Sequence, residues 1–244
     1  MTISTYAWQS SAKSDVGNIR SLNEDSYIER PDIQLWAVAD GMGGHHGGEI
    51  ASQLIVDSLK KVAGSFHSLS EYVDEVEDSL ISANTALRQL SQEQYASRTI
   101  GSTVACLLAY NGYIAYLWAG DSRVYRMRNG ELTQLTNDHS EVQRLIEEGL
   151  LDPALAESHP AANVITKAIG GQDDMTLQVG LDEVEDNDIY LLCSDGLYRD
   201  ISNAELKNFF GDNDVNESCE NLISTALSRT GADNLTAIVT RATA

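Results

Sequence analysis

The sequence predicts an α+β fold in which strands and helices form separate layers. Apolar runs of strand length, long stretches with helical periodicity and the segregation of the two along the chain favour this class over a doubly wound parallel sheet. The chain has 244 residues, of which 42% are hydrophobic, and we find no internal repeat. We therefore expect one domain over residues 1–244 with a sizeable core.

The first half of the chain predicts strands followed by two helices. Residues 5–11 and 26–39 have the pattern of extended segments, and the run QLWAVA is a fully apolar strand that ends at Asp40. From Glu49 onward the apolar residues recur with a helical period. A second helix is expected over residues 69–95, on the same criterion.

The second half predicts mostly strands. Four segments have strand patterns: STVACLLAY, GYIAYLWAGD, SRVYRMR and ELTQL. Asn-Gly pairs at 111–112 and 129–130 connect two pairs of these segments, and such pairs are strong hairpin signals, so we expect an antiparallel meander. Residues 138–165 combine a short helical pattern with a polar stretch that contains proline, and we expect a surface excursion there. DIYLLC is another buried strand, residues 203–228 have a helical pattern, and LTAIVTR is the last strand.

Composition excludes several classes of partner. A net charge of −21 without a basic patch argues against nucleic acid and against anionic membranes. The N-terminus lacks the pattern of a secretory signal, and the chain lacks an apolar run of membrane-spanning length, so we expect a cytoplasmic protein. Three unevenly spaced cysteines argue against a disulfide framework and against zinc. The excess of acids fits either general solubility or clustered carboxylates that bind cations.

Four acids share one context, next to the end of an apolar strand. They are Asp40, Asp121, Asp195 and Asp233. Taken singly, each could be a turn residue or a helix cap. Strand ends form a rigid platform, however, and four carboxylates brought together there repel one another unless a cation lies among them. Oxygen ligands suit Mg²⁺ or Mn²⁺, so we predict a pair of such ions and hydrolysis by water that they activate.

Two further features fit the predicted cations and a phosphate substrate. The glycines after Asp40 allow a backbone carbonyl to approach a charged ligand closely. Arg20, four residues before Glu24, is our candidate for the guanidinium that grips phosphate oxygens. Arg123 is a second candidate, although it could instead pair with Asp121 at the surface.

Eight segments occur in an order that resembles one protein family. They are RSLNEDS, VADGMGGHHGGE, GSTVACLL, GDSRVY, LTNDHS, ITKAIGG, CSDGL and DNLTAIV. With them the chain resembles, over nearly its whole length, the metal-dependent Ser/Thr protein phosphatases of the PP2C (PPM) family, in their bacterial stand-alone form. The resemblance implies a β-sandwich of two antiparallel sheets flanked by pairs of helices, in four αββα layers, with a flap at about residues 138–165.

The resemblance also implies roles for individual residues. Asp40 would bridge two Mn²⁺ or Mg²⁺ ions, and Arg20 would orient the phosphate. The remaining implied ligands are Asp195 and Asp233 for the first ion, the Gly41 carbonyl and Glu24 for the second, and Asp121 with Asp195 for a third, weaker ion. Asp25 would act on the ions through water.

One departure from the family pattern affects the general acid. Animal members carry a histidine directly after the Asp-Gly pair, and this chain has Met42. His45 or His46 could donate the proton from the same loop, or a metal-bound water could supply it. We take His45 as the catalytic candidate and leave the alternatives open.

The implied activity is hydrolysis of phosphoserine and phosphothreonine in proteins by direct attack of water that bridges two cations. The implied substrates are phosphoproteins, including an opposing Ser/Thr kinase, and we expect a monomer. A pseudophosphatase that binds phosphoproteins without turnover is the first alternative, although Asp40, Asp195 and Asp233 are all present. A phosphatase of anti-sigma-factor antagonists is the second.

Overall fold

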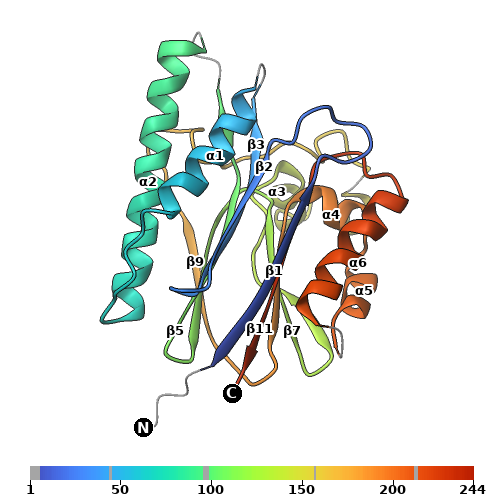
Figure 1. Ribbon diagram of the computed structural model, residues 1–244. Helices are drawn as coiled ribbons and strands as arrows, with labels where there is room; N and C mark the ends of the chain where they lie inside the picture. Colours follow the sequence, from blue (N-terminus) through green and yellow to red (C-terminus); the bar gives the residue numbers. More distant parts are fainter. Residues whose placement is uncertain (1–5, 44–45, 96–98, 157, 212–213) are drawn as a thin grey trace.

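The protein is a sandwich of two β-sheets with helices on both outer faces (Figure 1). The computed structural model describes residues 6–43, 46–95, 99–156, 158–211 and 214–244. The start of β1 and the C-terminus lie at one end of the sandwich, and the loop of residues 16–24 lies at the opposite end. The predicted α+β sandwich is confirmed.

Five strands form the first sheet, and every neighbouring pair is antiparallel. In sheet order they are β1 (Ala7–Asp15), β11 (Leu235–Thr243), β10 (Ile189–Cys193), β7 (Arg123–Arg128) and β8 (Glu131–Gln134). The last strand of the chain therefore pairs with the first and with a third strand far from both in sequence.

The second sheet is also antiparallel. Its strands in order are β2 (Asp25–Arg30), β3 (Leu35–Met42), β5 (Val104–Tyr110), β6 (Tyr113–Ala119) and β9 (Gln178–Glu183), and the short β4 (Gly101–Ser102) pairs with the end of β3. The edge strand β9 was not predicted from the sequence. Its exposed apolar residues Val179 and Leu181 do not produce the buried pattern of the other strands.

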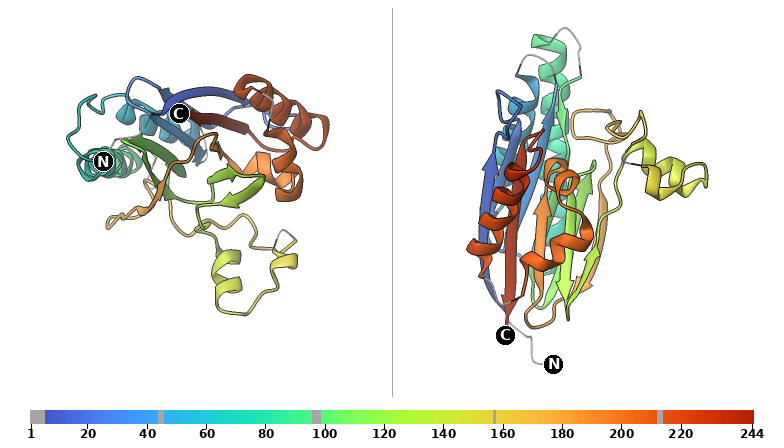
Figure 2. Two further views of the ribbon diagram at one scale, coloured as in Figure 1. Left: turned by 90° about the horizontal axis from the view of Figure 1, so that it is seen from below. Right: turned by 90° about the vertical axis from the view of Figure 1, so that its right-hand side faces the viewer.

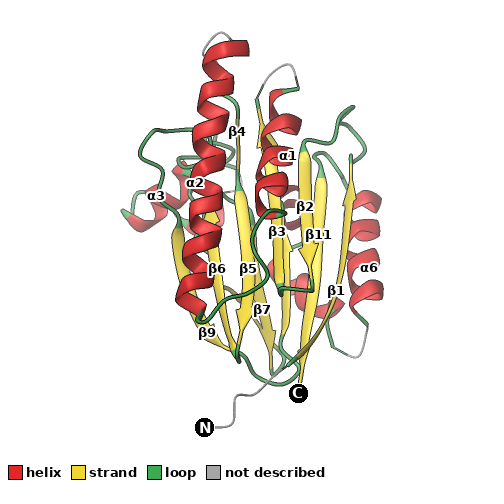
Figure 3. Cartoon of the chain, turned by 60° about the vertical axis from the view of Figure 1, so that its left-hand side comes forward, coloured by secondary structure: helices red, strands yellow, loops and turns green. Residues whose placement is uncertain are grey.

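Five of the described helices, all except α3, bury residues against a sheet. The helices α1 (Gly47–Leu59) and α2 (Leu69–Gln94) lie side by side over the second sheet (Figure 3). Three other helices cover the first sheet: α4 (Asp195–Asp200), α5 (Asn203–Leu206) and α6 (Val215–Ser228). A third apolar cluster fills the space between the sheets.

Alternation along β3 explains why this strand has no polar side. Leu35, Ala37 and Ala39 pack toward the helices, whereas Trp36 and Val38 pack between the sheets. The same alternation directs the next residue, Asp40, toward the space between the sheets. An apolar run buried on both faces thus delivers a carboxylate to the interior end of the sandwich.

The predicted meander is divided between the two sheets, which corrects the sequence analysis. The hairpins β5–β6 and β7–β8 form as the Asn-Gly pairs predict, with Asn111 and Asn129 at positive φ. The chain between them crosses from the second sheet to the first at residues 120–122. Gly120 has φ +107 there, and a Cβ would lie 2.6 Å from the Thr103 side chain. Only glycine fits this crossing.

The helix predicted over residues 203–228 is interrupted. After α5, a 3₁₀ turn (Lys207–Phe209) leads to Phe210 in extended conformation and to Gly211 at φ +122. The helix α6 then starts at a new cap, because the Asp214 side chain accepts a hydrogen bond from the Glu217 N–H at 2.8 Å. The apolar periodicity alone did not indicate this break.

The segment that was predicted as a surface excursion lies outside the two sheets. Residues 138–156 and 158–165 project from the sandwich and carry α3 (Glu141–Glu147) and a 3₁₀ turn (Pro153–Leu155) (Figure 2). A β-bridge between Ser140 and Ile165 closes the base of this flap. Among the described helices, none is long and apolar enough to cross a membrane.

Candidate metal centre and phosphate site

The centre of the site is a pair of aspartates on adjacent strands. Asp25 at the start of β2 is the register partner of Asp40 on β3, so their side chains leave the sheet on the same face. The Asp40 N–H donates to the Thr103 hydroxyl at 3.1 Å, and the Asp40 carbonyl accepts from the Thr103 N–H at 2.9 Å. Burial, followed by the charges of Asp25 and three other acids, raises the pKa of Asp40 well above its usual range.

Asp25 joins the two sheets. Its Oδ2 accepts two hydrogen bonds at 2.7 Å, from the hydroxyl of Ser194 directly after β10 and from the hydroxyl of Thr236 on β11 of the first sheet. Its Oδ1 is buried and has no hydrogen-bond partner among the described residues. Burial raises the pKa of Asp25 to about 7, against the lowering effect of the two hydroxyl donors. The family resemblance implied only an indirect role for this residue, through water, and the sequence did not single out Ser194 or Thr236.

Two further acids reach the site from the first sheet, and each is paired with an arginine. Asp195 is the first residue of α4, directly after β10, and its Oδ2 lies 2.7 Å from Arg199. Burial raises the pKa of Asp195, although the Arg199 charge acts in the opposite direction. Asp233 precedes β11 and forms a two-pronged pair with Arg20, with both distances at 2.9 Å.

Asp121 lies on the crossing between the sheets. The crossing, not a strand end, places it at the site, and its backbone carbonyl accepts a hydrogen bond from the Tyr198 hydroxyl at 3.1 Å. The residue is 3% exposed, and its Oδ1 has no hydrogen-bond partner in the described part of the chain. Burial and the charge of Asp195 raise the pKa of Asp121 to about 7.

The Gly41 carbonyl and the Glu24 carboxylate converge on one point. A Cβ built on Gly48, in the first turn of α1, would lie 2.7 Å from the Gly41 oxygen and 2.5 Å from Glu24 Oε1. Only a glycine at position 48 leaves both oxygens where they are. The backbone adds to this arrangement, because the Gly41 N–H donates to the Glu24 carbonyl at 3.1 Å.

Asn234 holds the loop that carries Arg20 and Glu24. Its amide donates to the carbonyls of Val16 at 2.9 Å and Leu22 at 3.0 Å, and its Oδ1 accepts from the Glu24 N–H at 2.8 Å. The residue is 7% exposed. Sequence reasoning missed it, because an asparagine after Asp233 has the appearance of an ordinary turn residue.

Arg123 is not available to bind phosphate. It pairs with Asp138 through three hydrogen bonds and lies with its guanidinium carbon 3.5 Å from the centre of the Tyr198 ring. Both members of the pair are largely buried. The alternative pairing with Asp121 is also wrong, since Arg123 contacts Asp138 on the segment that leads into the flap.

The histidine candidates differ in what can be said of them. His45 lies outside the described residues. His46 starts α1 at φ 64, and its exposed imidazole lies 3.6 Å from Glu49. His46 therefore points to solvent beside an acid of its own helix.

The donor set fits divalent cations that prefer oxygen. In the described segments no three Asp, Glu, His or Cys side chains already surround a common point as ligands, and two of the acids are turned toward arginines. Nevertheless five buried or partly buried aspartates occupy one end of the sandwich, and Asp25 and Asp121 each have an oxygen that no described residue contacts by a hydrogen bond. Carboxylates this close together are stabilised when cations bind among them.

Comparison with known proteins identifies the family. The sequence profile of protein phosphatase 2C matches residues 20–240. The chain is 35% identical over 236 residues to the Ser/Thr protein phosphatase PstP of Mycobacterium tuberculosis, covering 96% of this chain and 45% of PstP, so it spans about half of that relative. It is 36% identical to the protein phosphatase PhpP of Streptococcus pneumoniae, covering 91% of this chain and 92% of PhpP.

Solved structures agree with this assignment. PppA, described as a key regulatory component of the T6SS in Pseudomonas aeruginosa, superposes with a TM-score of 0.89 at 37% identity over 96% of this chain and 97% of PppA. The catalytic domain of PstP in complex with two manganese ions superposes with the same TM-score at 32% identity, covering 98% and 100% of the two chains. The resemblance noted from the sequence is thus confirmed: the chain belongs to the protein phosphatase 2C family of metal-dependent Ser/Thr phosphatases.

Proposed function

We propose that this protein removes phosphate from phosphoserine and phosphothreonine in proteins and requires Mn²⁺ or Mg²⁺ for this reaction. The observation that carries the proposal is the group of buried aspartates at one end of the sandwich, with Arg20 at its rim. Divalent cations in such a site neutralise the carboxylates and supply the Lewis-acid chemistry that hydrolyses a phosphate ester.

We propose that the ions are held by five groups: the side chains of Asp40, Asp195, Asp233 and Glu24 and the carbonyl of Gly41. Asp40 comes from the second sheet, whereas Asp195 and Asp233 come from the first, so a site built from them is closed only when the sheets pack together. The hydroxyls of Ser194 and Thr236 keep Asp25 in place between the sheets. The chain therefore holds its proposed ligands on strands or within a few residues of a strand end, which are rigid positions.

Arg20 would bind the phosphate group of the substrate. Its side chain is 54% exposed, and its guanidinium already holds a two-pronged pair with the Asp233 carboxylate. Two oxygens of a phosphate group can accept the same two parallel hydrogen bonds from a guanidinium as the two oxygens of a carboxylate. A substrate phosphate would therefore exchange with, or share, this guanidinium at the entrance of the site.

Phosphoproteins are the substrate class, and we propose that a Ser/Thr kinase of the same cell is among them. The family resemblance supports this pairing. We also propose a cytoplasmic location, which agrees with three buried free cysteines. The candidate acid His45 remains a proposal from the sequence.

The first test is hydrolysis of a phosphothreonine peptide by the purified protein, after chelation and with Mn²⁺ added back. Turnover should return only with the metal. The Asp40→Asn variant should bind peptide but lose turnover, because it removes a charge from the centre of the acidic group. Undiminished turnover in Asp40→Asn would refute the ligand assignment. A folded protein that is inactive with every divalent ion would favour the pseudophosphatase alternative.

A further inference from the structure

Two buried carboxylates from different segments of the chain lie near the same arginine side chain. Asp121 lies on the crossing between the sheets, and Asp195 starts α4. Their side chains are 4% and 12% exposed. Like charges at such depth repel one another strongly unless a positive charge is placed near them.

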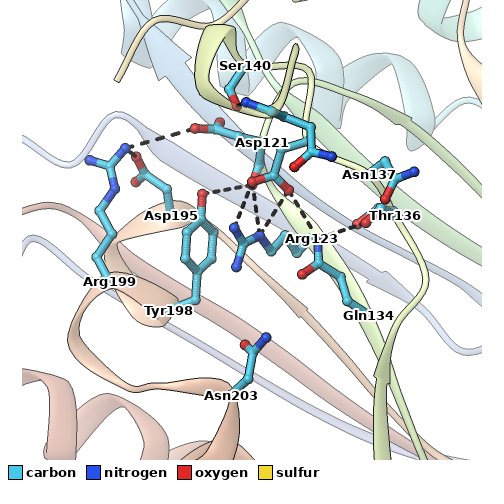
Figure 4. Close-up of polar contacts among 12 residues, drawn as sticks. Asp121, Arg123, Gln134, Thr136, Asn137, Ser140, Asp195, Tyr198, Arg199 and Asn203 are labelled. Atoms are coloured by element: carbon cyan, nitrogen blue, oxygen red, sulfur yellow. Dashed lines mark hydrogen bonds and ion pairs between the residues drawn. The ribbon is translucent and has the colours of Figure 1, made fainter. Parts of the chain in front are cut away.

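Arg199 supplies that charge. It lies one helical turn after Asp195, and its Nη2 is 2.7 Å from Asp195 Oδ2 and 4.0 Å from Asp121 Oδ2. Figure 4 shows the guanidinium directed toward both carboxylates. The second oxygen of Asp121 has no partner among the described residues. The arginine thus satisfies the pair only in part, and oxygen ligands for a more compact cation are left over.

The arginine also has room to leave. A pocket of about 310 Å³ adjoins the pair between α4 and the flap, and Asp121, Ser140, Tyr198 and Arg199 are among its lining residues. The Arg199 side chain is 32% exposed. A guanidinium at this position can therefore turn toward solvent without disrupting the core.

We propose that Arg199 is a built-in cation that occupies the Asp121–Asp195 pair and opposes the binding of a divalent ion there. The inference rests on the metal dependence proposed above. A divalent ion and the guanidinium would need the same two carboxylates, so only one of them can be accommodated at a time. Residue 199 would then set how many ions the site takes, without contacting the proposed ligands Asp40 and Asp233.

The test compares the number of Mn²⁺ ions bound by the complete chain and by the Arg199→Gln variant, using isothermal titration calorimetry and the electron paramagnetic resonance of free Mn²⁺. The variant should bind one more Mn²⁺ per chain, or bind the weakest ion at least tenfold more tightly. Arg199→Lys keeps a positive charge and should gain less. Adding Asp121→Asn to Arg199→Gln should remove the gained ion.

Arg30→Gln is the matched control. It removes the same charge from a two-pronged pair with Asp32, at the end of β2 far from Asp25, and should leave the number of ions unchanged. Equal stoichiometry and equal affinities in the unchanged protein and in a folded Arg199→Gln variant would overturn the inference. The inference would also be overturned if the Arg199→Gln variant still bound the additional Mn²⁺ after Asp121→Asn was added to it. Failure of the proposed function is distinguishable, because it would appear as absent turnover in the unchanged protein.

Discussion

Replacing Gly48 by alanine should damage the proposed second metal site while leaving the fold largely intact. The position is in the first turn of α1, where alanine favours the helix over glycine by about 1 kcal/mol. The added methyl group, however, would lie 2.5 Å from Glu24 Oε1 and 2.7 Å from the Gly41 carbonyl oxygen. Atoms do not approach a real Cβ closer than 3.0 Å, so both oxygens must move.

The required movement can be compared with what a metal site tolerates. Glu24 Oε1 must retreat by about 0.5 Å and the Gly41 oxygen by about 0.3 Å to reach 3.0 Å, whereas ligand distances in metal sites are fixed to about 0.2 Å. The Glu24 side chain can turn away at little cost in strain, but the Gly41 oxygen belongs to the backbone of β3. We expect Mn²⁺ affinity at this site to fall by about 10- to 100-fold, as when partners of metal ligands are changed, or by about 1.4 to 2.8 kcal/mol.

The neighbouring glycine provides a matched control. A Cβ on Gly47 would lie 2.6 Å from Ile100 Cγ2, a side-chain methyl group, and it meets no proposed ligand. Calorimetric Mn²⁺ titration and thermal unfolding of both variants separate the two effects. Gly47→Ala should lower the melting temperature without weakening Mn²⁺ binding. Gly48→Ala should weaken Mn²⁺ binding without lowering the melting temperature. Unchanged Mn²⁺ affinity in Gly48→Ala would refute the assignment of these two oxygens.

Three further predictions concern charge and the loop. Burial raises the pKa of Asp25 and Asp121 to about 7, above the value of about 3.9 for an unfolded chain. The metal-free folded protein therefore binds more protons than the unfolded chain between about pH 4 and pH 7, so its melting temperature in chelator should fall as the pH rises through this window. Asp121→Asn should show a smaller fall, and an equal fall in both proteins would show that the buried Asp121 carboxyl does not cause it. Arg20→Ala should raise KM for phosphopeptide without lowering Mn²⁺ affinity, since its exposed pair with Asp233 is worth about 1 kcal/mol or less; a loss of bound Mn²⁺ in calorimetry would count against a role in phosphate binding. Asn234→Ala leaves three backbone groups without their hydrogen-bond partner, so it should destabilise the protein by about 2 to 3 kcal/mol in denaturant unfolding. It should also raise KM, because the loop that carries Arg20 loses its anchor. Wild-type stability would show that the loop does not depend on this side chain.

Local pattern was sufficient for most elements of the fold. Ser68 caps α2 by accepting from the Glu71 N–H at 3.1 Å, and the helix runs over Leu69–Gln94, within a residue of the prediction. Both hairpin turns follow from their Asn-Gly pairs, because asparagine and glycine tolerate positive φ. These features depend on residues that are close in sequence.

Sequence reasoning was wrong or silent where distant segments decide the outcome. The hairpins β5–β6 and β7–β8 have equal signals, and nothing within them states that they belong to different sheets. The exposed edge strand β9 depends likewise on the sheet that its segment meets. The break between α5 and α6 coincides with Gly211 at positive φ and with the Asp214 cap, which the apolar periodicity does not contain. Arg123 was assigned to phosphate or to Asp121, but packing turned it to Asp138.

The sequence by itself predicted four acids, Asp40, Asp121, Asp195 and Asp233, because each lies near an apolar run that must be buried, and a residue beside a buried strand has little freedom of position. Only the tertiary structure decided what each acid meets. Asp25 binds hydroxyls of the opposite sheet, Asp195 and Asp121 share Arg199, and Gly48 leaves space for two oxygens. Such contacts join residues separated by up to 211 positions, and their energy depends on distance and burial, which no local pattern contains.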